Sequence, residues 1–84
     1  MNELSTALAK IVIDFCLFFE FSDSSAVDPD AATKMMEKIA YELQGLSESQ
    51  KGSVCEIFNE ISSHYDERFS SFILSLPENL GLMD

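Results

Sequence analysis

Residues 11–21, IVIDFCLFFEF, form the most apolar stretch of the 84-residue chain and are interrupted only by Asp14 and Glu20. A helix that begins near Glu3 and turns about 100° per residue acquires two apolar stripes on opposite sides. The larger stripe is expected to face the core. It consists of Leu4, Leu8, Ile11, Val12, Phe15 and Phe19, flanked by Cys16 and Phe18, and the second stripe consists of Ile13, Leu17 and Phe21.

The second stripe needs a cover, because a helix that is apolar almost all round is buried almost all round. Three covers are available: the loop and C-terminal tail of the same chain, a second copy of the chain, or a different protein. Apolar stripes usually belong to a protein's own core. Two-fold self-association is the commonest way to bury one that does not, which makes Ile13, Leu17 and Phe21 a candidate oligomer interface.

A second helix is predicted over residues 29–44. Asp28 is suited to cap it, and Pro29 fits the first helical position because proline has no N–H to lose there. Gly45 is expected to end the helix in the left-handed conformation, with Leu46 folding back on the last turn. The residues expected to pack fall on one face: Ala32, Met35, Met36, Ile39, Leu43 and Leu46.

A third helix is predicted over residues 48–64, because Ser47 and Gln50 have the spacing of a capping box. If it continued unbroken, Arg68 would point into the core, so a break is expected near residues 64–66. Asp66 would cap a fourth helix over residues 66–76, which Pro77 is expected to end. The inner stripe of the third helix consists of Val54, Ile57, Phe58, Ile61 and Tyr65.

These elements predict an all-α fold in a single domain, residues 1–84: a small bundle of three long helices and a short C-terminal fourth helix. Cys16 and Cys55 stand in apolar runs without CxxC spacing, which indicates two buried thiols in a reducing compartment. Lys10, Asp14 and Glu20 interrupt the first helix too often for a membrane span, and no signal-peptide pattern accompanies it. A cytoplasmic location is expected.

The charge narrows the choice of partner. Fifteen acidic against five basic residues give a net charge of −10. Nucleic acids and anionic membranes require clustered positive charge, so neither is an expected partner.

Residues for catalysis are hard to find, and an enzyme is not expected. The one histidine, His64, lies on the polar side of its helix, where nothing suggests contact with a cysteine. Glu60 and His64 form only one pair of metal ligands, and the three glycines are isolated from one another. No cofactor, metal or small-molecule substrate is therefore expected.

The acidic residues gather on one side of the third helix and past its end. This surface, which we call the acidic face, is a candidate docking site for a basic protein, although a run of charge is often only a solvated helix face. Tyr41 lies opposite the core side of the second helix and could anchor a partner. The candidate partner-binding residues are Glu56, Asn59, Glu60, Ser63, Asp66, Glu67 and Tyr41.

The stretch VDPDAATKMMEKIAYELQGLS and the closing LPENLGL, within residues 27–82, resemble the small helical immunity proteins of contact-dependent growth inhibition systems. The chain is also similar in size, charge and helix number to colicin nuclease immunity proteins. It lacks their tyrosine-tyrosine-proline motif, so no binding residues carry over. The resemblance implies neutralisation of a cognate toxin, often a nuclease with a basic cleft.

Two functions follow as hypotheses. The first is an immunity protein that masks a basic toxin with its acidic face. The alternative is a small helical adaptor or regulatory subunit that assembles through the second stripe of the first helix. Salt should weaken binding led by exposed charges, which are screened within about 8 Å at physiological ionic strength, and should not weaken binding led by apolar contact.

Overall fold

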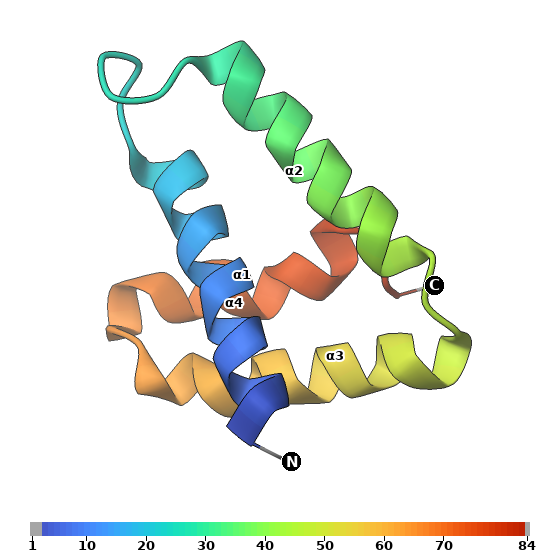
Figure 1. Cartoon of the computed structure of the whole chain (residues 1–84). Helices are drawn as coiled ribbons and strands as arrows, with labels where there is room; N and C mark the ends of the chain where they lie inside the picture. The colour runs from blue at the N-terminus through green and yellow to red at the C-terminus, as the bar shows by residue number, and fades with distance from the viewer. Residues whose placement is uncertain (1–2, 84) are drawn as a thin grey trace.

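The computed structural model describes residues 3–83, and within them all regular structure is helical (Figure 1). In chain order the elements are α1 (Glu3–Phe21), α2 (Pro29–Gln44), α3 (Glu48–Ile61), the 3₁₀ turn η1 (Ser62–His64) and α4 (Glu67–Asn79). The all-α prediction is confirmed, as is the break between the third and fourth helices. α4 has 13 residues and α3 has 14, so the fourth helix is not markedly shorter than the third.

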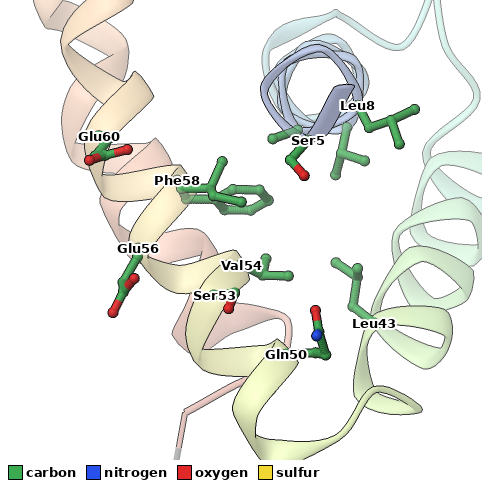
Figure 2. Close-up of a pocket in the computed structure, with 12 residues that line it drawn as sticks. Ser5, Leu8, Leu43, Gln50, Ser53, Val54, Glu56, Phe58 and Glu60 are labelled. Carbon is green, nitrogen blue, oxygen red and sulfur yellow. The ribbon is translucent and has the colours of Figure 1, made fainter. Parts of the chain in front are cut away.

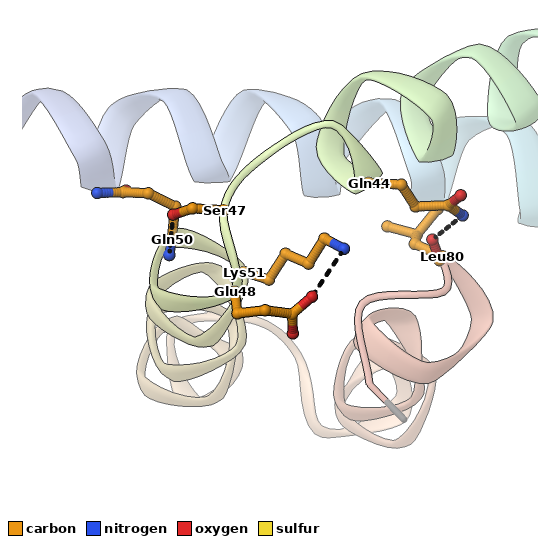
Figure 3. A network of polar contacts seen from close by, with 6 residues as sticks. All are labelled: Gln44, Ser47, Glu48, Gln50, Lys51 and Leu80. Atoms are coloured by element: carbon orange, nitrogen blue, oxygen red, sulfur yellow. Dashed lines mark hydrogen bonds and ion pairs between the residues drawn. The ribbon is translucent and has the colours of Figure 1, made fainter.

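The helix starts follow the predicted caps. Asp28 accepts a hydrogen bond from the backbone N–H of Ala31 at 3.0 Å, and Asp66 accepts one from that of Arg68 at 3.0 Å. Ser47 Oγ accepts from the N–H of Gln50 at 3.2 Å, which is one of the two bonds of a capping box (Figure 3). Each cap satisfies a donor that the first helical turn leaves without a partner.

Two helix ends differ from the prediction. Gly45 is right-handed, with φ −73° and ψ −9°, and its N–H bonds back to Tyr41 and Glu42 as the chain turns directly into the cap of α3. α4 passes through Pro77 and ends at Asn79. Pro77 offers no N–H to the carbonyl four residues before it, and its own carbonyl accepts the N–H of Leu82 at 2.8 Å.

That bond belongs to a Schellman motif, which lies at Gly81 instead of Gly45. Gly81 has φ 76°, a conformation that favours glycine, and its N–H bonds to the Glu78 carbonyl at 3.0 Å. A side chain at Gly81 would also collide with Gln44, whose Nε2 donates to the carbonyl of Leu80 at 2.8 Å (Figure 3). The motif therefore returns the C-terminal tail to the end of α2.

The core lies between α1, α3, α4 and the tail. Pro77 and Leu82 are buried at its edge, and Met36, Ile39 and Leu43 of α2 pack against it from outside. Met35 and Leu46 are more exposed than the predicted face of α2 implies. The buried core cluster consists of Ala9, Ile13, Cys16, Phe58, Ile61, Ile73, Leu76, Leu80 and Leu82.

α1 is rotated relative to the prediction. Its buried residues are Ala9, Ile13 and Cys16, and Ile13 has no exposed surface. The predicted core stripe is largely on the outside, because Leu4, Leu8, Ile11, Phe15 and Phe18 each expose 50–68% of their surface. Val12 and Leu17 of the same helix are partly buried and pack against this core.

The predicted oligomer interface is therefore mostly internal. Ile13 lies in the core and Leu17 packs against it. Phe21 remains half exposed, but its ring lies 5.2 Å from that of Phe69 and 5.4 Å from that of Phe72, centroid to centroid, and so joins the end of α1 to α4. No helix within residues 3–83 combines the length and apolar character needed to cross a bilayer.

The rotation of α1 can be tested with Ile11 and Ile13, which are two positions apart and therefore lie on opposite faces of the helix. Ile13→Ala should lower the free energy of unfolding by about 2–5 kcal/mol, because it leaves a cavity in a filled core. Ile11→Ala should lower it by about 0.5 kcal/mol or less, because the Ile11 side chain is half exposed. Urea unfolding of both variants in dilute solution measures the difference, and a larger loss for Ile11→Ala would contradict the structure.

Candidate partner-binding surface

The acidic face is exposed as predicted. Glu56, Asn59 and Glu60 project from α3, Ser63 follows in η1, and Asp66 and Glu67 stand at the start of α4, all of them open to solvent. Ser63 Oγ donates to the carbonyl of Glu60 at 3.2 Å, which keeps η1 in line with the end of α3. The structure thus places these six residues along one continuous segment, which runs from α3 through η1 to the start of α4.

Tyr41 is also exposed, at 76%, but it belongs to α2. It is not among the residues that line the cavity beside the acidic face. The structure therefore gives Tyr41 no part in the same site, and it stays a separate candidate contact.

Two of the acids border a groove between α1, α2 and α3. In Figure 2, Leu8, Leu43, Val54 and Phe58 converge on this space from the three helices, while the side chains of Glu56 and Glu60 project from the outer side of α3, away from it. The groove has a volume of about 510 Å³ and is open to solvent. Its lining residues are Ser5, Leu8, Ala9, Val12, Leu43, Gln50, Ser53, Val54, Glu56, Ile57, Phe58 and Glu60.

The acids differ in their ionic surroundings. Within the part of the chain that the structure describes, Glu56, Glu60 and Glu67 form no ion pair, whereas Asp66 lies 3.7 Å from Arg68 Nε. The guanidinium of Arg68 also lies 4.7 Å from the centroid of the Phe69 ring. Asp66 is therefore occupied as a helix cap and as an ion-pair partner, and the free negative charge of the acidic face rests on the three glutamates.

Three titratable groups respond to their surroundings, and each has a structural explanation. Burial raises the pKa of the Cys16 thiol to about 11. Burial also raises the pKa of Tyr65, whose hydroxyl donates to Asp14 Oδ1 at 2.7 Å and holds η1 against α1. The Ser25 hydroxyl and the N–H groups of Ser25 and Ala26 lower the pKa of Asp23 by bonding to its carboxylate in the first loop.

Neither a metal cluster nor a histidine-based nucleophile emerges from the geometry. Across residues 3–83, no three His, Cys, Asp or Glu side chains converge in a way that could hold an ion. His64 is exposed at the end of η1, and the two cysteines are free. Cys55 is only partly buried, so the prediction of two buried thiols is correct for Cys16 alone.

One exposed surface was missed by sequence reasoning. Leu4, Leu8, Ile11, Phe15 and Phe18, which we call the apolar face of α1, were expected in the core and lie outside it. Successive members are 4, 3, 4 and 3 residues apart, a spacing that fits a seam with another chain as well as packing in the chain's own core, so periodicity alone did not reveal their exposure.

Comparison of the chain with protein-family models, with curated proteins and with solved structures finds no match.

The cysteine environments predict different reactivities. Thiolates are the reactive species, and burial both shields Cys16 and disfavours its thiolate at neutral pH. In the native chain a disulfide reagent such as DTNB should modify Cys55 readily and Cys16 only after denaturant is added. A Cys55→Ser variant, which should show no fast reaction, assigns the two phases. Equal rates for both thiols in the native wild type would contradict the burial of Cys16.

Proposed function

We propose that this chain is an immunity-type inhibitor, which binds a basic toxin through the acidic face and the groove beside it and thereby blocks the toxin's active cleft. The observation that carries the proposal is the position of Glu56 and Glu60, two glutamates that form no ion pair within residues 3–83 and that lie beside a groove of mixed polar and apolar lining. A protein surface that combines charge with apolar side chains in a groove is suited to a partner that carries both features.

The mechanism follows from this arrangement. Lysine or arginine side chains of the toxin would pair with Glu56, Glu60 and Glu67, while an apolar side chain would enter the groove lined by Val54, Ile57 and Phe58. The net charge of −10 would draw a basic partner in and speed the encounter. A nuclease needs its basic cleft to hold a polyanion, and an acidic protein bound there or beside it competes for the same positive charge.

This function needs no reaction by the chain itself, and it would be carried out in the cytoplasm, where an immunity protein meets its toxin. The alternative function, a small adaptor or regulatory subunit, is supported by the continuous apolar face that α1 exposes. That face differs from the stripe proposed by the sequence, and it lies on a different helix from the acidic face.

Charge reversal tests the role of the acidic face. Glu56→Lys, Glu60→Lys and Glu67→Lys, combined in one variant, should abolish protection when the chain is co-expressed in a bacterial host with the toxic domain encoded directly upstream of its own gene. Reversing three attractive charges at once leaves repulsion in their place, and we expect at least a 100-fold loss of affinity, each lost close pair contributing on the order of 1 kcal/mol.

The matched control reverses Glu37, Glu42 and Glu78, which are equally exposed and lie on α2 and α4. It changes the net charge by the same amount and should retain protection. Full protection by the first variant, or equal loss in both, would reject the acidic face as the binding site. A gene neighbourhood without any toxic domain would reject the immunity function itself.

A further inference from the structure

We propose that the apolar face of α1 is the interface of a two-fold homodimer. Leu4, Leu8, Ile11, Phe15 and Phe18 form one continuous strip along the helix, each at least half exposed. With roughly 200 Å² for each large side chain, the strip presents about 500 Å² of apolar surface, near the upper end for a monomer. Single exposed apolar residues are ordinary, whereas a strip of this length marks a surface that something covers.

The shape of the strip fits a helix. Its 4-3-4-3 spacing keeps the apolar side chains in line with a neighbouring helix at a small crossing angle. Ile11, Asp14, Phe15 and Phe18 surround a surface hollow of about 350 Å³. Residues i, i+3, i+4 and i+7 of one helix are the four that form a hole for a single side chain, or knob, of a facing helix.

A second copy of the chain is the occupant that the residues favour. The aliphatic members of the strip, Leu4, Leu8 and Ile11, lie at one end, and the bulkier Phe15 and Phe18 lie at the other. Antiparallel pairing places each aliphatic end against an aromatic end, which keeps the distance between the two helices even. The strip is thus complementary to itself under a two-fold rotation, as an isologous interface requires.

The strip itself carries little charge. Asp14 is the one ionisable side chain that lines the hollow, and its carboxylate already accepts the Tyr65 hydroxyl from within the chain. A membrane-surface helix would instead carry a strongly basic polar face, and Lys10 is the single basic residue of α1. Full burial of the strips of two copies would remove about 1,000 Å² from solvent, which is below the roughly 1,200 Å² of stable specific interfaces, so we expect a weak dimer of micromolar affinity.

The salt dependence of this dimer should be opposite to that of toxin binding. Each copy has a net charge of −10, and bringing two copies together costs free energy through repulsion that salt screens. The apolar contact itself is not weakened by salt. Dimerisation should therefore strengthen as ionic strength rises, whereas binding through the acidic face should weaken.

Sedimentation equilibrium of the full chain tests the proposal. The wild type should reach twice its 9.4 kDa mass as concentration and salt increase. Phe15→Glu should remain monomeric with an unchanged helical circular dichroism spectrum, because the Phe15 side chain is half exposed in the single chain. Ile11→Gln provides a second, milder variant should Phe15→Glu unfold. Neither residue lines the groove, so both variants should keep toxin protection if the acidic face binds the toxin.

The matched control is Leu74→Glu, an equally exposed leucine on α4, which should leave the dimer intact. A wild type that stays monomeric at high concentration and high salt would overturn the proposal. So would a dimer that survives Phe15→Glu and Ile11→Gln, or one that Leu74→Glu dissociates.

Discussion

The close contact of α1 with the core, made through Ala9, Ile13 and Cys16, determines the rest of the structure. These three residues are the buried ones of α1, and Val12 and Leu17 of the same helix pack beside them. Residues of α3, α4 and the C-terminal tail enclose them, and Leu80 and Leu82 join this core through the Schellman turn at Gly81. The same orientation of α1 leaves most of its large apolar residues on the outside.

The packed helices leave two surfaces of different chemistry exposed, the acidic face and the apolar face of α1. α3 and the start of α4 expose glutamates that form no ion pair within residues 3–83, beside a groove of mixed lining, and α1 exposes an apolar helical seam with little charge. Only Leu8 belongs to both. Under the two proposals, electrostatics would lead the chain to a basic toxin and apolar contact would hold two copies together, and these two interactions would respond to salt in opposite directions.

The sequence predicted what depends on local chemistry. Asp28, Ser47 and Asp66 mark helix starts because each cap bonds within its own turn, and the exposure of Glu56 and Glu60 follows from the single apolar stripe of α3. The end of α4 was less predictable. α4 continues through Pro77, and the turn that follows includes a hydrogen bond from the N–H of Leu82, five positions later, to the Pro77 carbonyl. The groove draws side chains from three helices, so no local pattern reveals it.

The rotation of α1 could not be predicted from periodicity, since a helix that is apolar on two faces gives no preferred direction. The larger stripe was expected inside, whereas the structure buries Ala9, Ile13 and Cys16. A NOESY spectrum of the isotope-labelled chain tests most directly which residues of α1 face the core and which face outward. We predict contacts within one chain from the Ile13 methyl groups to side chains of α3 or α4, and contacts between chains from Leu4 and Leu8 to the rings of Phe15 and Phe18. Contacts within one chain from Ile11 and Phe15 to the side chains of α3 and α4, with Ile13 contacting only its own helix, would contradict the account.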